Sequence, residues 1–249
     1  MAVHSFETMG TMVSIRTTGA DVSSTLLADI TQSFASLNEK FSLYLDGSEI
    51  SQIARGERAL TDSSEEMREE YARALHWREK TDGAFTPHRP DGVIDLSGTI
   101  KAVAIDAATQ LLHGAGVKNF SVNVGGDLTT SGNQNAEIPG WITGIVDPAH
   151  SESLLAVVRL TPEFPAMATS GTAERGEHIW RRPETTKDFV QATVIAHDII
   201  TADVLATAII SGGHSALNQI TQNFAVAVMT VDRDGAVLAN PSFQELVAR

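Results

Sequence analysis

The chain has 249 residues and no cysteine. Disulfides, thiolate metal sites and cysteine nucleophiles are therefore excluded, and we expect no lipid anchor on an N-terminal cysteine. Basic residues are also few, because 18 Lys and Arg stand against 31 Asp and Glu, giving a formal net charge of −13. So acidic a chain lacks the general positive field that attracts nucleic acid or an anionic membrane surface. To bind a phosphate compound it would need a metal ion or a few well-placed donors.

Long apolar runs are missing as well. No stretch of about 18 apolar residues predicts a membrane span, and the start, MAVHSFETMGTMVSIR, has neither the basic nor the apolar region of a signal peptide. We expect a cytoplasmic protein, with a trimmed exported chain as the alternative. Because low-complexity linkers and internal repeats are absent too, residues 1–249 are interpreted as one domain.

Helical periodicity dominates the first half of the chain. Apolar residues from Leu26 to Leu37 follow a candidate cap at Asp21, and a second helix over residues 61–83 places Met67, Tyr71 and Leu75 on one face. A third helix is predicted over residues 99–116. Its predicted apolar face comprises Ile100, Val103, Ala104, Ala107 and Leu111, and Gly114 and Gly116 end it.

The second half is dominated by strands. Runs with strand composition cover 119–124, 141–146, 154–160, 189–196 and 224–231, a further strand is predicted at 11–19, and DRDG before AVLA indicates a closing hairpin. A helix over 200–213 interrupts them. Helices and strands are thus partly segregated along the chain, which favours an α+β fold with mixed or antiparallel sheets and packed helices.

The helix ITADVLATAIISGG carries an acid and a hydroxyl on one face, because Asp203 and Thr207 are four residues apart. In one interpretation Asp203 lies in the first turn of a helix capped by Thr201, where an acid is favoured by about 0.3–1 kcal/mol. Thr207 would then bond back to a carbonyl. In the other, the pair is half of a magnesium shell, since Mg²⁺ takes one or two carboxylates and completes its shell with water and substrate phosphates.

A second candidate site is the turn IDLSGTIK. Asp95 and Ser97 precede Gly98, and Lys101 follows at the start of a helix. Such a turn can receive a phosphate at the positive helix end, with the lysine as a point charge. An ordinary strand-to-helix turn with an exposed lysine is equally compatible.

Three further stretches carry possible chemistry. VNVGGDL can admit a ring or backbone closely at its glycines, or form a tight turn that holds Asp127. ATSGTAERGEHIW places Ser170 and Gly171 in a turn and offers His178 as a general base or as a structural histidine. In TDGAFTP, Ala84 and Phe85 could pack against a flat ring or belong to the core.

The order of these stretches along the chain resembles the ApbE family, the FAD:protein FMN transferases. The resemblance rests on MGTMVSI, FSLYLDGSEI, TDGAFTP, IDLSGTIKAVAID, VNVGGDL, ATSGT and ITADVLATA, from Met9 to about Gly213. It implies a magnesium-dependent enzyme that cleaves FAD, releases AMP and attaches FMN to a threonine or serine of a target flavoprotein. Alternatives are an FAD pyrophosphatase that passes FMN to water, and a non-catalytic FAD-binding module.

The resemblance also implies a set of site residues. Magnesium would be held by Asp203, Thr207 and the backbone of Gly98, and His178 would activate the incoming hydroxyl. The residues implied to contact FAD are Met9, Tyr44, Ala84, Phe85, Thr86, Asp95, Lys101 and Ile179. The chain departs from the family at Thr86, where an aspartate is usual, at Ala102, where a glycine is usual, and in the run HIWRRPETT.

Overall fold

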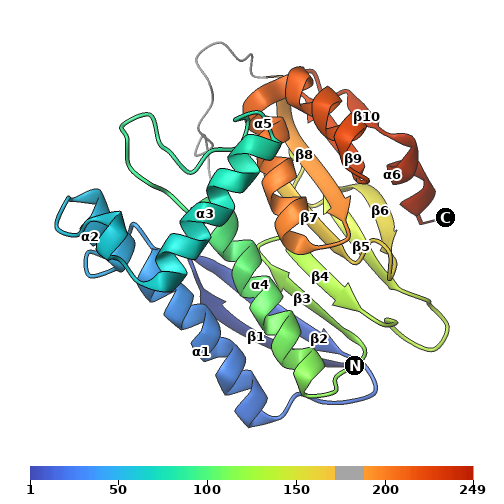
Figure 1. Cartoon of the computed structure of the whole chain (residues 1–249). Helices are drawn as coiled ribbons and strands as arrows, with labels where there is room; N and C mark the ends of the chain where they lie inside the picture. Colours follow the sequence, from blue (N-terminus) through green and yellow to red (C-terminus); the bar gives the residue numbers. More distant parts are fainter. Residues whose placement is uncertain (172–187, 249) are drawn as a thin grey trace.

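The computed structural model describes residues 1–171 and 188–248, and those residues form an α+β fold (Figure 1). The strands are β1 (Ala2–Thr8), β2 (Thr11–Thr17), β3 (Phe120–Val124), β4 (Asp127–Ser131), β5 (Trp141–Val146), β6 (Leu154–Leu160), β7 (Ala166–Gly171), β8 (Phe189–Ala196), β9 (Ala227–Asp232) and β10 (Val237–Ala239). The helices are α1 (Ser24–Phe41), α2 (Glu49–Ala54), the 3-10 turn η1 (Leu60–Asp62), α3 (Glu65–Lys80), α4 (Ser97–Gly114), α5 (Ile199–Asn223) and α6 (Pro241–Leu246).

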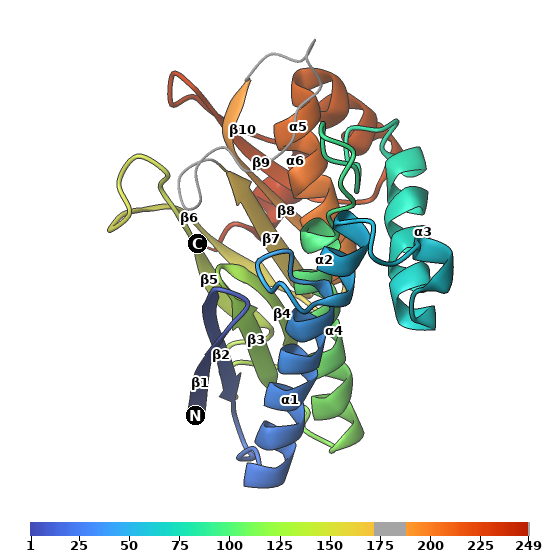
Figure 2. The same cartoon turned by 90° about the vertical axis from the view of Figure 1, so that its left-hand side faces the viewer.

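Eight strands form one sheet in the order β1-β2-β3-β4-β7-β8-β9-β10, and every neighbouring pair is antiparallel. β5 and β6 pair separately as a two-stranded sheet. Seen from the side, the larger helices cover one face of the main sheet and the β5–β6 pair lies toward the other (Figure 2). The α+β prediction, with antiparallel sheets and packed helices, is confirmed.

Alternate side chains of the central strands pack into two separate hydrophobic cores, one on each face of the sheet. On β8, Val194 points into the large core that the sheet shares with the helices, whereas Ile195 points into a smaller core beneath β5, β6 and α6. β9 divides in the same way at Val228 and Met229. The period of two in these strands therefore produces a three-layered arrangement, with apolar side chains buried on both faces of the sheet.

Helix α5 is the most buried helix-forming segment. It is long and apolar enough to cross a membrane by composition alone, but 72% of its most apolar window is buried inside the protein. It packs against β7 and β8 and against α4. We therefore interpret its apolar character as that of a core helix.

Two predicted helix caps are wrong. Helix α1 is capped by Ser23, whose hydroxyl accepts from the Leu26 amide at 3.2 Å, and not by Asp21. Helix α5 is capped by Asp198, whose Oδ1 accepts from the Thr201 amide at 2.8 Å. Thr201 is therefore inside the helix. Asp203 lies in the second turn, beyond the first-turn position where the helix dipole favours an acid.

The buried faces of two helices are rotated from the predicted ones. Helix α3 buries Met67 and Trp77 fully, together with the carboxylate of Glu70, whereas Tyr71 and Leu75 are half-buried. In α4 the buried set is Thr99, Ile100, Ala102, Ala104, Ile105, Ala108 and Leu112. Val103 and Leu111 are only partly buried. Helix α4 contacts α1 and α5 as well as β3 and β4, so its buried face is wider than the periodicity suggests.

The predicted strands are confirmed, but three observed strands were not predicted and one turn prediction is wrong. The strands without a prediction are the edge strand β1 and the central strands β4 and β7. Ser170 and Gly171, predicted in a turn, are the last residues of β7 and pair with Ala192 and Gln191 of β8. The predicted end of the third helix is confirmed, because α4 stops at Gly114. The predicted closing hairpin is confirmed as the antiparallel pair β9–β10.

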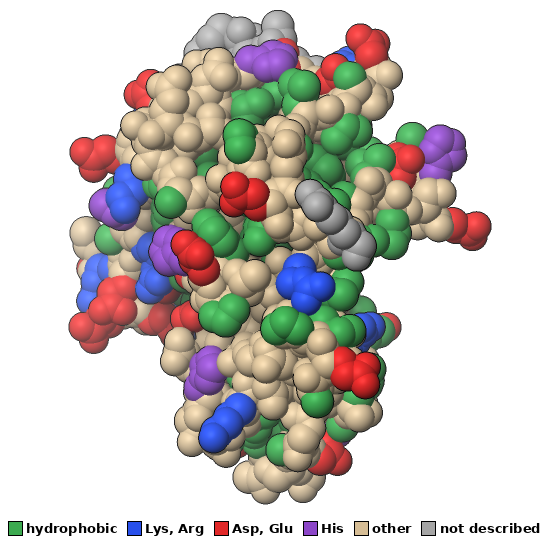
Figure 3. Space-filling model, turned by 90° about the vertical axis from the view of Figure 1, so that its right-hand side faces the viewer, with side chains coloured by type: hydrophobic (Ala, Val, Ile, Leu, Met, Phe, Trp, Pro, Cys, Tyr) green, Lys and Arg blue, Asp and Glu red, His purple; other side chains and the backbone are tan. Residues whose placement is uncertain are grey.

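On the side of the molecule that carries the C-terminus, the described residues form no continuous basic surface (Figure 3). Acidic, basic and apolar side chains alternate across this face (Figure 3). Exposed apolar residues of β5, β6 and β10 include Val146, Leu154 and Leu238. This mixed surface agrees with the net charge of −13. A phosphate compound would therefore have to be bound by a few well-placed side chains or a metal ion.

Candidate functional site

The start of α4 lies against the TDGAFTP segment. A Cβ added to Gly98 would lie 3.0 Å from the ring of Phe85, so glycine allows the helix to approach this ring closely. Asp95 organises the turn before the helix, because its Oδ1 accepts from the Ser97 amide at 2.9 Å and its own amide donates to the Pro87 carbonyl at 2.8 Å. The structure thus packs Phe85 against Gly98 at the start of α4 and places Asp95 in the turn before that helix. The family resemblance implies all three residues for one site.

The same segment contacts α5. The Ser211 hydroxyl donates to the carbonyl of Ala84, and a Cβ added to Gly212 would lie 2.9 Å from the Cβ of Ala84. Ala84 and Phe85 are 9% and 4% exposed. Both side chains therefore belong to the core between α4 and α5. A flat ring could pack only against the small part of these side chains that is exposed.

Lys101, in the second turn of α4, forms an ion pair with Asp127 at the start of β4. The Asp127 side chain is 1% exposed and that of Lys101 is 22% exposed. The second carboxylate oxygen of Asp127 accepts from the Thr169 amide of β7 at 2.9 Å. A buried carboxylate is tolerated only when it is paired and hydrogen-bonded. Asp127 therefore joins a helix and two strands.

One residue further along β7, Ser170 reaches α5. Its hydroxyl lies 3.1 Å from the hydroxyl of Thr207. Asp203, one turn earlier on the same helix, is 5% exposed. Thus β7 contacts Asp127 through Thr169 and Thr207 through Ser170, so two consecutive residues connect the lysine on α4 to the hydroxyl on α5.

The remaining predicted site residues are placed as follows. Met9 has a positive φ of 50° in the β1–β2 turn, next to the β3–β4 turn, because the amide of Gly125 donates to the Met12 carbonyl. Thr86 accepts from the His88 amide. Tyr44 is 97% exposed and is the residue least integrated into the site. His178 and Ile179 lie outside the described residues.

The side chains suit a hard cation bound partly by its substrate. Across residues 1–171 and 188–248, no group of three or more His, Cys, Asp or Glu side chains could hold a metal ion by itself. Asp203 and Thr207 carry one carboxylate and one hydroxyl one turn apart on α5, and the family resemblance implies the Gly98 carbonyl as a third oxygen ligand. This small oxygen set fits Mg²⁺, which prefers oxygen ligands and usually keeps positions for water and substrate phosphates.

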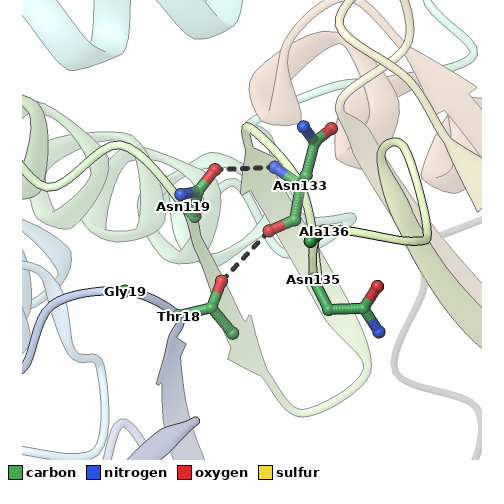
Figure 4. A pocket seen from close by; sticks show the side chains of 6 residues that line it. All are labelled: Thr18, Gly19, Asn119, Asn133, Asn135 and Ala136. Carbon is green, nitrogen blue, oxygen red and sulfur yellow. Dashed lines mark hydrogen bonds between the residues drawn. The ribbon is translucent and has the colours of Figure 1, made fainter.

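A small hollow elsewhere on the sheet is distinct from this site. It has a volume of about 270 Å³ and is lined by Thr18, Gly19, Asn119, Asn133, Asn135 and Ala136 (Figure 4). Asn119 Oδ1 accepts from the Asn133 amide, and the Thr18 hydroxyl donates to the Asn133 carbonyl. These bonds lie at the ends of β3 and β4 opposite the Gly125–Gly126 turn, so the hollow is remote from Lys101 along the strands.

Comparison with known proteins identifies the family. The ApbE family model matches residues 9–89 and 88–230, which is most of the chain. The chain belongs to the ApbE family. The resemblance based on the motifs is therefore confirmed. The matched ranges include every described residue that the resemblance implied for the site.

Curated relatives and solved structures agree with this family. The FAD:protein FMN transferases of Escherichia coli K12 and Rhodobacter capsulatus are 26% and 27% identical over 159 and 162 residues. Those alignments cover 59% and 61% of this chain but 44% and 30% of the relatives, so the chain spans about half of their length or less. The flavin transferase ApbE of Vibrio cholerae superposes with a TM-score of 0.80 at 22% identity, covering 98% of each chain. The ApbE protein of Thermotoga maritima gives a TM-score of 0.80 at 20% identity, covering 100% and 99%.

Two residues beside the candidate site, Asp127 and Ser170, are not assigned to it by the motifs. The motifs offer a tight turn for Asp127 and predict a turn for Ser170. The available sequence signal for Asp127 is its position directly after the VNVGG run, at the start of the strand DLTTS. The ion pair and the Ser170–Thr207 contact depend on long-range packing, which no local pattern encodes.

Proposed function

We propose that this ApbE-family chain is a magnesium-dependent FAD:protein FMN transferase that attaches FMN to a threonine or serine of a target flavoprotein and releases AMP. The observation that carries the proposal is a chain of contacts that connects Lys101 on α4 to Thr207 on α5. Lys101 pairs with Asp127, Asp127 accepts from the Thr169 amide of β7, and the next residue of β7, Ser170, contacts Thr207. The names of the curated relatives support the same activity.

The reaction is a transfer of a phosphoryl-linked group, which relies mainly on positioning and on neutralising charge. The acceptor hydroxyl attacks the phosphorus of the FMN half of FAD. The bond from that phosphorus to the bridging oxygen breaks, and AMP leaves with the electron pair. The hydroxyl proton passes to a base, for which the family resemblance proposes His178.

The chain's own groups have distinct parts in this step. Lys101 binds the pyrophosphate as a point charge in a protein of net charge −13. Asp203, Thr207 and the Gly98 carbonyl would hold magnesium, which when bound supplies further neutralisation of the phosphate oxygens. Phe85 supports the start of α4 by packing against Gly98. FAD contacts by Met9, Tyr44, Thr86, Asp95 and Ile179 belong to the same proposal.

The experiment follows AMP, free FMN and protein-bound flavin together. The protein is incubated with FAD, Mg²⁺ and an extract of the source cells, and flavin fluorescence is read on a denaturing gel. AMP in excess of free FMN, with a fluorescent acceptor band, supports the transferase. Equal AMP and FMN, unchanged by adding extract, would replace it with an FAD pyrophosphatase. If the protein binds FAD but releases no AMP at any Mg²⁺ concentration, the chain is a non-catalytic FAD-binding module.

A matched pair of variants tests the location of the activity. Lys101→Met removes the proposed phosphate charge, whereas Lys118→Met removes a lysine next to the remote hollow. We expect only the first variant to lose FAD turnover. Equal turnover by both variants would refute the assignment of Lys101.

A further inference from the structure

Asp127 presents an electrostatic contradiction in the proposed site. Its carboxylate is 1% exposed and is paired with Lys101, the residue proposed to bind the pyrophosphate. A negative charge beside a phosphate site repels the substrate, and the repulsion is strong where water is excluded. By charge alone, asparagine would serve better at this position.

Geometry gives a reason for the carboxylate. Asp127 is the first residue of β4, directly after a turn in which Gly125 and Gly126 both have positive φ. A Cβ added to Gly125 would lie 2.6 Å from the hydroxyl of Thr11, so the turn is packed tightly against β2. The main chain that carries Asp127 is therefore fixed on one side by this turn and on the other by β7.

The two carboxylate oxygens have separate partners. Oδ1 accepts from the Thr169 amide, and Oδ2 pairs with the ammonium of Lys101. A lysine side chain has several rotatable bonds and loses up to about 2 kcal/mol of conformational free energy when fixed. An ion pair to a rigid, fully buried carboxylate fixes this side chain before the substrate binds.

We propose that Asp127 is a positioning residue that holds the Lys101 ammonium toward the pyrophosphate of FAD. This inference rests on the proposed function. Asp127 itself does not contact the reacting atoms. Its benefit, pre-organisation of Lys101, exceeds the repulsion that its charge adds. Because Thr169 precedes Ser170, the same carboxylate also fixes the part of β7 that contacts Thr207.

The test exploits the opposite signs of the two effects. Asp127→Asn has the same shape and keeps an oxygen to accept from the Thr169 amide, but loses the charge. FAD affinity is measured by quenching of flavin fluorescence, with and without Mg²⁺, and KM and kcat are measured by AMP release. We expect affinity to fall about tenfold, which corresponds to the loss of one charge-assisted contact, with a matching rise in KM and little change in kcat.

The same substitution in a Lys101→Met background completes a double-mutant cycle. There Asp127 has no lysine to position, so Asp127→Asn is expected to leave FAD affinity unchanged or to increase it. An equal loss in both backgrounds would overturn the inference, as would tighter FAD binding by the single variant. Loss of the fold in the single variant, monitored by thermal unfolding, would overturn it too, because Asp127 would then be needed for structure alone.

The outcomes also separate this inference from the proposed function. If the wild-type protein binds FAD but releases no AMP, the transferase proposal fails while the affinity cycle still decides the role of Asp127. If the wild-type protein does not bind FAD, both fail. Asp29→Asn, at an exposed site on α1, is the control and should behave as wild type.

Discussion

Replacing Asp203 by asparagine distinguishes a metal ligand from a helix cap. The cap of α5 is Asp198, and Asp203 lies in the second turn with 5% exposure. Loss of a cap would cost about 0.5–2 kcal/mol. Asparagine keeps the size of the side chain and one of its oxygens, so we expect the free energy of unfolding without metal to change by less than about 1 kcal/mol.

The assay is thermal unfolding with and without Mg²⁺ and FAD. For a chain of this size, 1 kcal/mol corresponds to a Tm shift of about 2–4 °C. Ligand at about 100 times its dissociation constant adds about 2.7 kcal/mol, so the wild-type Tm should rise by about 5–11 °C. Asp203→Asn should lose the part of this rise that depends on Mg²⁺, and turnover should fall by at least about 10²-fold, because a metal ion contributes several kcal/mol to such a transition state.

Two results would refute this reasoning. A variant with the wild-type Mg²⁺-dependent Tm shift would show that Asp203 does not hold the metal. A variant that unfolds without metal would show that the carboxylate is structural. The exposed Asp29→Asn, on α1, controls for the loss of one negative charge and should reproduce both wild-type values.

Three further predictions use other contacts. Gly212→Ala should destabilise the protein by about 1–3 kcal/mol in urea unfolding, because the new methyl would lie 2.7 Å from the Cβ of Ala216 and 2.9 Å from that of Ala84; an unchanged midpoint would contradict this packing. Burial raises the pKa of Glu70 above its usual 4.5, so the ionised carboxylate destabilises the folded state. Glu70→Gln should therefore raise the free energy of unfolding at pH 7, and this gain should disappear as the pH falls below about 4.5. A gain that does not depend on pH would show that the buried charge is not its cause. Lys101→Met should weaken FAD affinity about tenfold or more, measured by flavin fluorescence; wild-type affinity would contradict the proposed pocket.

Local patterns predicted the long helices, most of the strands and the buried side of α1, but not the full buried sides of α3 and α4. In α3, Glu70 is buried on the same face as Met67 and Trp77, although a carboxylate marks a solvent face in any periodicity argument. The edge strand β1 was missed because it depends on tertiary contacts: it pairs with β2 from Ala2 opposite Thr17 to Thr8 opposite Thr11, and its Phe6 packs against Phe34 of α1. The buried side of a helix and the pairing of an edge strand both depend on segments that are distant in the sequence or form a separate layer.

The candidate site divides in the same manner. Asp203 and Thr207 could be paired from the sequence, since four residues in a helix bring two side chains to one face. Lys101 and Gly98 could likewise be placed at a helix start. Asp127 could not be joined to Lys101, because 26 residues and a change from helix to strand separate them.

The sequence by itself determined the class of fold, the helix that carries the acid and the hydroxyl, and the family, because these depend on periodicity and on ordered motifs. Only the tertiary structure decided that the cap of α5 is Asp198, that Asp127 is buried against Lys101 and that Ser170 contacts Thr207. The reason is physical. A buried charge or hydroxyl takes its partner from whichever element packs against it, and in an antiparallel sheet that element is set by strand order, which local sequence does not encode.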